Sequence, residues 1–163
     1  MRICRVRDVK VPNRGTDRSA GIDFFIPENS EDFVNAFMEK NKDITINSDG
    51  IFIESGQRVN IPSGIKANVP EGYALIAYNK SGVSLKYGLD IGASVVDEDY
   101  QGEIHLSLVN TSNKQVHITY GQKIVQFILL PVFYDSIEEV SEEDCFDFET
   151  QRGSGAFGST GVK

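Results

Sequence analysis

Two stretches of the chain combine residue types that could act on a phosphorylated substrate. Residues 152–161 read Arg-Gly-Ser-Gly-Ala-Phe-Gly-Ser-Thr-Gly, so glycine amides, hydroxyls and a guanidinium stand together. Glycines let backbone N–H groups cradle phosphate oxygens, and Arg152 offers a planar fork for a phosphate. The ring of Phe157, set among small residues, could stack on a nucleobase. The stretch indicates an anion-binding arm; its alternative is a disordered tail.

The glycines of this arm do not predict a standard nucleotide-binding fold. Gly153, Gly155 and Gly158 form a GxGxxG, but that fingerprint requires a strand before it and a helix after it. The same residues form a GxxxxG followed by Ser159-Thr160, which is a P-loop pattern without its lysine. Because the sequence ends two residues after Gly161, neither motif has the helix that it needs.

The second stretch, residues 92–103, carries a candidate general base. Two valines lead into the acidic turn Asp97-Glu-Asp, and Tyr100 leads toward the next strand, a pattern that predicts a β-hairpin. An oriented, ionised Asp97 could deprotonate water; the alternative is a solvated turn carboxylate. Residues 79–82, Asn-Lys-Ser-Gly, place a cation, a hydroxyl and a glycine amide at one turn, which is either an anion grip or an ordinary loop.

Short strands must position these groups. Turn signals such as Pro62-Ser-Gly and Pro70-Glu-Gly separate β-rich runs, and many short strands predict an all-β sandwich, jelly roll or barrel. The β-rich runs lie at residues 59–69, 73–78, 104–109 and 123–130.

One segment departs from the strand pattern. Residues 31–40 place Phe33 and Phe37, and Val34 and Met38, at i,i+4 spacing. Ser30 can serve as the N-cap, so the segment predicts one short amphipathic helix.

Composition restricts the class of protein. A chain of 163 residues suits one domain, and the net charge of −8 argues against a nucleic-acid partner. No apolar stretch approaches the ~20 residues that span a membrane, and no secretory signal is recognisable. Cys4 and Cys145 lack metal-ligand spacing, which favours free thiols and a cytoplasmic location.

The charge is unevenly distributed. Residues 135–151 hold eight carboxylates and no Lys or Arg, whereas residues 152–163 hold two cations and no carboxylate. This organisation predicts an acidic tether that carries a mobile, glycine-rich C-terminal arm.

In order along the chain, these segments resemble the five motifs of the trimeric dUTPase family. The first motif is Ser-Ala-Gly-Ile-Asp-Phe at 19–24, and the second is Asn-Lys-Ser-Gly-Val-Ser-Leu-Lys at 79–86. Residues 92–103 resemble the third and Gly-Gln-Lys-Ile-Val-Gln-Phe-Ile at 121–128 the fourth. Residues 152–161 nearly match the fifth. Together the motifs span almost the whole chain.

The resemblance implies a jelly-roll-like β subunit, assembled as a homotrimer with active sites shared between subunits. It implies Mg²⁺-dependent hydrolysis of dUTP to dUMP and pyrophosphate, which limits uracil incorporation into DNA and supplies dUMP for dTTP synthesis. Asp97 would activate water for attack on the α-phosphorus, and Tyr100 would pack beneath the deoxyribose. The backbone from Ser94 to Val96 would recognise uracil, and Asp23 would hold a water of the Mg²⁺ shell.

The remaining roles concern the phosphates and the arm. Lys80, Ser81, Gly82 and Gln126 would hold the phosphates. From a third subunit, Arg152 would bind the γ-phosphate, Phe157 would stack on uracil, and Gly158, Ser159 and Thr160 would close over the phosphates.

The sequence departs from the family pattern at three places. Lys80 stands where arginine is usual, Ser94 replaces a common glycine, and residues 28–50 look like an insertion. The insertion could be a packing element, a lid or a surface for a protein partner.

Two other functions stay open: a dCTP deaminase of the same fold, and a dUTP-sensing interaction protein. Ammonia release would identify the deaminase, and loss of partners on deleting residues 28–50 would identify the interaction protein.

Overall fold

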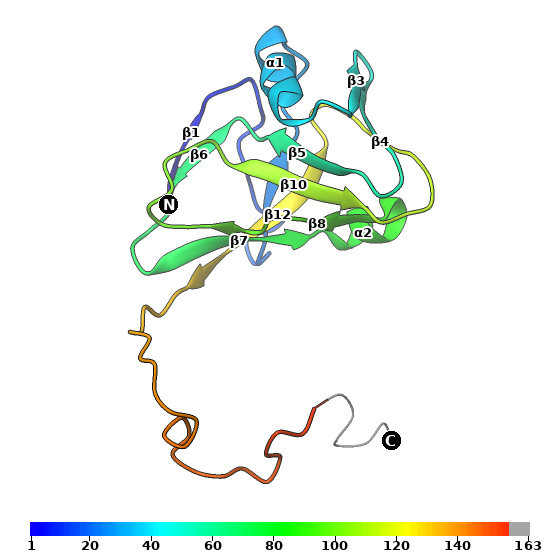
Figure 1. The fold of residues 1–163 in the computed structure, drawn as a ribbon. Coiled ribbons are helices and arrows are strands. Elements are labelled where there is room, and N and C mark those ends of the chain that lie inside the picture. The colour runs from blue at the N-terminus through cyan, green and yellow to red at the C-terminus, as the bar shows by residue number, and fades with distance from the viewer. Residues whose placement is uncertain (157–163) are drawn as a thin grey trace. The chain divides into compact units, whose positions relative to one another are not determined.

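The computed structural model describes residues 1–156 and divides the chain into two compact units. The first unit comprises residues 1–133 and holds every helix and strand of the described chain (Figure 1). The second unit begins at Tyr134, and its described part, residues 134–156, consists of turns and irregular backbone. No helix in residues 1–156 is long and apolar enough to cross a membrane.

Twelve strands and two helices make up the described structure. In chain order they are β1 (Arg2–Arg5), β2 (Ile22–Phe25), α1 (Glu31–Lys40), β3 (Thr45–Asn47), β4 (Gly50–Ile53), β5 (Arg58–Pro62), β6 (Ile65–Asn68), β7 (Tyr73–Asn79), α2 (Ser81–Tyr87), β8 (Leu89–Ile91), β9 (Val95–Val96), β10 (His105–Asn110), β11 (Val116–Ile118) and β12 (Lys123–Pro131). The four predicted β-rich runs all contain strands, and the first is split in two at the Pro62-Ser-Gly turn.

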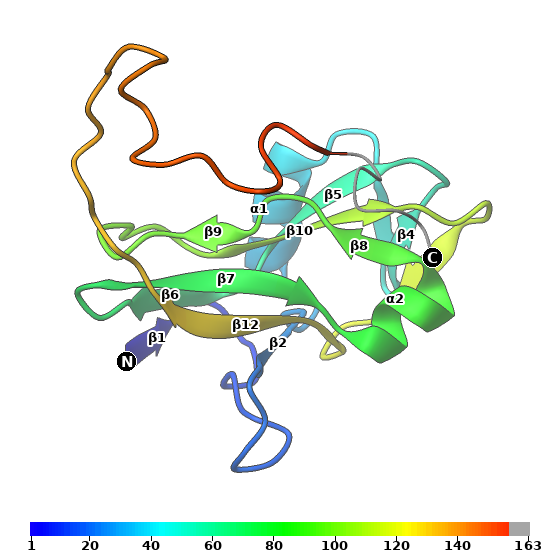
Figure 2. The same cartoon turned by 90° about the horizontal axis from the view of Figure 1, so that it is seen from below.

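The strands form four sheets, ordered β1-β6, β5-β10-β8, β11-β4-β3 and β2-β12-β7-β9. The last sheet is the one that matters most for function, and all its pairings are antiparallel (Figure 2). Apolar side chains of all four sheets and of α1 contribute to one buried cluster, in which the rings of Phe24 and Phe127 lie 4.6 Å apart. This arrangement agrees with the predicted jelly-roll-like β sandwich.

Helix α1 has the bounds that the sequence predicts. Ser30 is its N-cap, and its Oγ accepts a hydrogen bond of 3.2 Å from Phe33 N. Phe33 and Phe37 are fully buried, whereas Met38 is 39% exposed. The i,i+4 aromatic pair therefore forms the face that packs on the core, and α1 lies beside β5 (Figure 1).

Two sequence expectations were wrong. The expectation of a single helix misses α2, which begins at Ser81 directly after its N-cap Lys80 and ends at a left-handed Gly88. The expected tight hairpin across residues 92–103 does not form either. Instead, β9 pairs with β7, while β10 pairs with β5 and with β8. The acidic turn therefore lies in the connection between β9 and β10, which are not paired with each other.

We predict that Phe37→Ala lowers the free energy of unfolding by about 3–5 kcal/mol, because it leaves a cavity beneath α1. Met38→Ala, on the exposed side of the same helix, should cost less than about 1 kcal/mol. Urea denaturation of both variants measures the two values. Equal losses would contradict the assignment of the buried face.

Candidate active site

Three of the predicted site residues, Asp23, Val96 and Gln126, lie on strands of the sheet β2-β12-β7-β9, and others directly follow or precede its strands. Asp23 of β2 lies opposite Gln126 of β12, which in turn lies opposite Tyr78 of β7. Val96 of β9 lies opposite Leu75, toward the other end of β7. The sheet therefore brings the predicted residues together as two clusters, one around Asp97 and one around Asp23.

The first cluster surrounds a pocket of about 220 Å³, referred to below as the Asp97 pocket. One wall consists of Ser94, Val95, Val96 and Asp97 on and beside β9, together with Tyr100. A second wall, from another sheet, consists of Asn60 of β5 with His105 and Ser107 of β10, and Ile104 and Phe127 complete the lining. Four residues predicted for base and sugar recognition and for catalysis thus line one cavity: Ser94, Val96, Asp97 and Tyr100.

Backbone hydrogen bonds hold the β9 wall in place. Ala77 N of β7 donates to Ser94 O over 2.7 Å, which continues the β7–β9 pairing toward residue 94. Tyr100 N donates to Asp97 O over 3.3 Å and closes the acidic turn. Because Asp97 itself is exposed, its carboxylate faces solvent at the pocket rather than the core.

Tyr100 is fixed by the residues that follow it. Its hydroxyl donates to Glu103 O over 2.8 Å. Gly102 is required for this conformation, because a Cβ at that position would overlap the Tyr100 ring. The hydrogen bond and the close approach of Gly102 thus position the ring at the edge of the pocket.

The second cluster is an ion-pair triad of Asp23, Lys80 and Lys123, referred to below as the anion cluster. Asp23 is 4% exposed; its Oδ1 is paired with Lys80 Nζ, and its Oδ2 with Lys123 Nζ at 3.0 Å. Burial raises the pKa of Asp23, but the hydrogen bonds and charges of the two lysines outweigh it. The net effect is a pKa below the ordinary value of 3.8.

Gln126 and Asn79 join this cluster to α2. Gln126 Nε2 donates to Asn79 O over 2.8 Å, and a Cβ at Gly21 would overlap the Gln126 side chain. Asn79 Nδ2 donates to Asp90 Oδ1 over 2.8 Å, and Ser84 Oγ of α2 donates to the same oxygen over 3.0 Å. These bonds fix the start of α2, where Ser81 and Gly82 are exposed.

The sequence analysis did not identify Lys123 or Asp90 as site residues. Lys123 stands within the fourth motif-like segment, and this was the available signal. Asp90 gave no local signal, because its partners are Asn79 of β7, Ser84 of α2 and Thr111 in the loop after β10.

The two clusters lie at different ends of β7. Asp97 follows Val96, whose partner is Leu75, whereas Lys80 follows Asn79 at the strand's C-terminal end. The five residue steps from Leu75 to Lys80 correspond to about 16 Å at a rise of roughly 3.3 Å per residue. Figure 2 shows α2 at that end of β7 and β9 alongside the other half.

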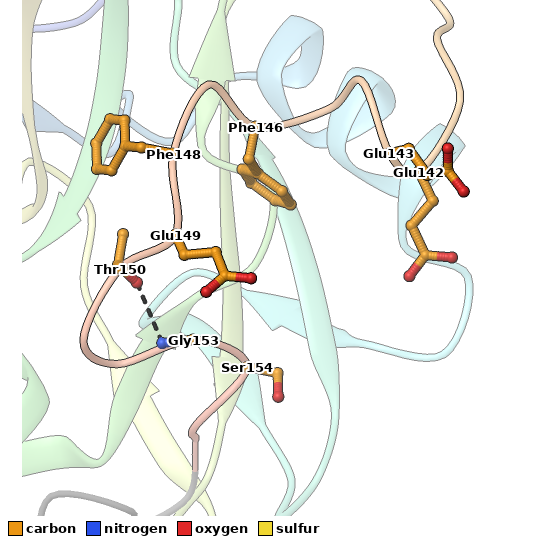
Figure 3. Close-up of a pocket in the computed structure, with 8 residues that line it drawn as sticks. All are labelled: Glu142, Glu143, Phe146, Phe148, Glu149, Thr150, Gly153 and Ser154. Atoms are coloured by element: carbon orange, nitrogen blue, oxygen red, sulfur yellow. Dashed lines mark hydrogen bonds between the residues drawn. The ribbon is translucent and has the colours of Figure 1, made fainter.

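The C-terminal unit contains Arg152, and the other predicted arm residues, Phe157, Gly158, Ser159 and Thr160, lie outside the described residues. Arg152 Nε donates to Gly155 O over 2.8 Å, and Thr150 Oγ accepts from Gly153 N over 3.1 Å (Figure 3). These turns border a hollow lined by three carboxylates, Glu142, Glu143 and Glu149, and by Phe146 and Phe148. Since the carboxylates would repel a phosphate, this hollow is not the candidate site.

Comparison with known proteins identifies a family model and relatives that match this chain. A family model described as dUTPase matches residues 42–161. The deoxyuridine 5'-triphosphate nucleotidohydrolase of Desulfitobacterium hafniense (strain DSM 10664 / DCB-2) is 42% identical over 113 residues, which cover 68% of this chain and 72% of that protein. The mitochondrial deoxyuridine 5'-triphosphate nucleotidohydrolase of Homo sapiens is 33% identical over 150 residues, or 92% of this chain. This chain spans half (50%) of the human protein's length.

A solved structure confirms the fold. The dUTPase of Staphylococcus bacteriophage 80alpha with dUPNHPP superposes with a TM-score of 0.77. The match covers 99% of this chain and 98% of that chain at 20% sequence identity. The likeness over nearly the full length of both chains shows that they share one fold.

We predict that the ion pairs of Asp23 make stability depend on pH. Because its pKa in the folded protein lies below 3.8, the unfolded chain takes up the proton first, and the stabilisation disappears as the pH falls through the folded pKa. Wild type should therefore exceed Asp23→Asn in unfolding free energy near pH 6, and the gap should shrink below pH 3.8. Denaturant unfolding at a series of pH values measures the gap, and a constant gap would contradict the ion-pair triad.

Proposed function

The chain belongs to the dUTPase family, and from this premise we propose that it hydrolyses dUTP to dUMP and pyrophosphate. The observation that carries the proposal is the Asp97 pocket. It joins an exposed carboxylate, a fixed tyrosine ring and the edge of a β-strand in one cavity of about 220 Å³. These are the three parts that a water-activating site with base and sugar selectivity requires.

In the proposed mechanism, Asp97 accepts a proton from a water molecule. The resulting hydroxide attacks the α-phosphorus, the bond from that phosphorus to the bridging oxygen of pyrophosphate breaks, and pyrophosphate leaves. Backbone groups between Ser94 and Val96 recognise the uracil edge, since a strand edge offers donors and acceptors that cytosine could not satisfy. The ring of Tyr100 packs beneath the deoxyribose and leaves no room for a 2′-hydroxyl.

The anion cluster is proposed to bind the phosphates. Lys80 contributes a positive charge, and Ser81 and Gly82 contribute first-turn N–H groups of α2 that have no carbonyl partner within the helix. Gln126 contacts the phosphates from β12, where its hydrogen bond to Asn79 O fixes it beside α2. Lysine in place of a usual arginine keeps the charge but gives up the bidentate fork.

Mg²⁺ is the proposed cofactor, and Asp23 is the residue that fits it. No group of three His, Cys, Asp or Glu side chains within residues 1–156 could hold a metal ion directly. Asp23 uses one lone pair of each oxygen for Lys80 and Lys123, so acceptor sites remain for waters of a hydrated ion. Such an ion would supply charge neutralisation on the triphosphate, which matches the preference of Mg²⁺ for phosphate oxygens and water.

A homotrimer with shared active sites is part of the proposal. About 16 Å of β7 separates the Val96 end of the Asp97 pocket from Lys80, which is too far for both clusters of one subunit to hold the same α-phosphate. The proposal places the pocket of one subunit beside the anion cluster of another, so that the α-phosphate lies close to both. The arm of a third subunit would then contribute Arg152, Phe157, Gly158, Ser159 and Thr160.

We propose that the chain forms a single domain, in which residues 135–151 are an acidic tether and residues 152–163 are a C-terminal arm. The tether and arm together nearly coincide with the second compact unit, which begins at Tyr134. The proposed location is the cytoplasm, in keeping with free thiols at Cys4 and Cys145, both exposed.

We predict that wild-type protein with Mg²⁺ releases pyrophosphate from dUTP much faster than from dTTP, dCTP or UTP. Asp97→Asn should lower kcat by about 10²–10⁴-fold, because it removes the base. The matched control is Asp99→Asn, which changes a carboxylate in the same turn that does not line the pocket. An Asp97→Asn variant with full activity would exclude Asp97 as the base.

We also predict complementation between two inactive chains. Chains truncated after Gln151 lack the arm, and Asp97→Asn chains lack the base. When co-expressed, they should form mixed trimers in which some sites combine an intact Asp97 with an intact arm. Pyrophosphate release should then appear in the mixture although each chain alone is inactive. Failure to complement in trimers verified by native mass spectrometry would contradict shared sites.

A further inference from the structure

Hydrogen bonds and ion pairs link the two ends of helix α1 to residues of the two walls of the Asp97 pocket, through Arg7 and Glu103 at one end and through Asn41 at the other. The helix lies in residues 31–40, before the residues 42–161 that the family model matches. Its packing on the core comes from Phe33 and Phe37, both fully buried, and from the partly buried Val34. The hydrogen bonds and ion pairs at the two ends of the helix are additional to this apolar packing.

At its N-terminal end, α1 is tied to the Tyr100 wall through Arg7. Arg7 Nη1 donates to Asp32 O over 3.1 Å and pairs with the Asp32 carboxylate in the first turn of the helix. Its other two donors form a bidentate pair with Glu103: Nε to Oε1 and Nη2 to Oε2, both at 2.9 Å. The side chains of Arg7 and Glu103 are only 13% and 14% exposed, so solvent screens this pair weakly.

Glu103 connects Arg7 to residues that line the pocket. Its Oε1 also accepts from Gly64 N over 2.7 Å. Its backbone oxygen accepts from Tyr100 OH over 2.8 Å and lies 2.9 Å from His105 Nδ1. A residue clamped by Arg7 and Gly64 therefore holds one pocket residue from each wall.

At its C-terminal end, α1 is tied to the β5 wall through its C-cap, Asn41. Asn41 is 5% exposed, and its side chain bonds both backbone groups of Asn60: Nδ2 donates to Asn60 O over 2.9 Å, and Oδ1 accepts from Asn60 N over 2.7 Å. Nδ2 also donates to Phe37 O over 2.8 Å. Asn60 lines the pocket beside its strand partner Ser107.

We propose that α1 is a brace that sets the separation of the two walls of the Asp97 pocket, and that Arg7, Glu103 and Asn41 are positioning residues for sugar selection. The inference rests on the proposed function for its substrate. Tyr100 can reject a 2′-hydroxyl only if the pocket residues of β5 and β10 are held at a fixed distance from its ring. The Arg7–Glu103 pair holds Tyr100 and His105 through Glu103, and Asn41 holds Asn60.

The first test uses variants that break the brace without leaving an unpaired buried charge. Arg7→Gln combined with Glu103→Gln removes both charges of the pair, which avoids the cost of a lone buried ion. Asn41→Ala removes the second connection. The matched control is Ile118→Val, a fully buried core position on β11 outside the pocket lining, and Glu39→Gln tests an exposed charge on α1 itself.

The readout is the ratio of kcat/KM for dUTP to kcat/KM for UTP, with the Tm of each variant. Both brace variants should lower this ratio by about tenfold, within the range that one misfitting contact costs in a shaped pocket. Ile118→Val should lower Tm and leave the ratio unchanged, and Glu39→Gln should change neither. An unchanged ratio in both brace variants would overturn the proposal, because a purely structural role moves Tm alone.

A measurement without nucleotide separates this inference from the proposed function. Amide hydrogen exchange at Tyr100 and Ala77, whose N–H groups hold the β9 wall, should be faster in the Arg7→Gln/Glu103→Gln variant than in Ile118→Val. If wild type does not hydrolyse dUTP, the proposed function fails and the exchange data alone decide on the brace. Equal exchange at both amides in the two variants would contradict it.

Discussion

The pairing of β7 with β12 is the constraint on which the rest of this structure depends. Seven consecutive residues of each strand are in register, from Val125 opposite Asn79 to Pro131 opposite Tyr73. β12 also pairs with β2, which contains Asp23. β7 also pairs with β9, which leads into the acidic turn. A slip of one residue would turn every side chain of these strands to the opposite face, so this one register fixes both clusters.

The same register separates the two clusters, and this separation links catalysis to assembly. The protein is acidic overall, with a net charge of −8, so a triphosphate must be neutralised locally. In the proposed site the anion cluster would do so with two lysines that pair with Asp23, while Asp97, the proposed base, lies toward the other end of β7. If the base and the anion cluster of one active site come from different subunits, only the assembled protein can be active.

The sequence predicted what local patterns encode. Helix α1 was predictable because an N-cap serine and an aromatic i,i+4 pair fall within ten residues. Helix α2 was missed because only Val83 of its seven residues is buried and Leu85 is 92% exposed, so no apolar face marks it. The partner of β9 was misassigned because pairing with β7 is non-local. The ion pairs of Asp23 were unpredictable without the fold, since Lys80 and Lys123 lie 57 and 100 residues away in the chain.

The central claim is that water activated by Asp97 attacks the α-phosphorus of dUTP. Hydrolysis in water enriched with ¹⁸O, followed by mass spectrometry of both products, tests it most directly. The account predicts that the label enters dUMP and is absent from pyrophosphate, because the bond broken joins the α-phosphorus to the bridging oxygen. Label in pyrophosphate would mean attack at the β-phosphorus and would contradict the proposed placement of the substrate between Asp97 and the anion cluster.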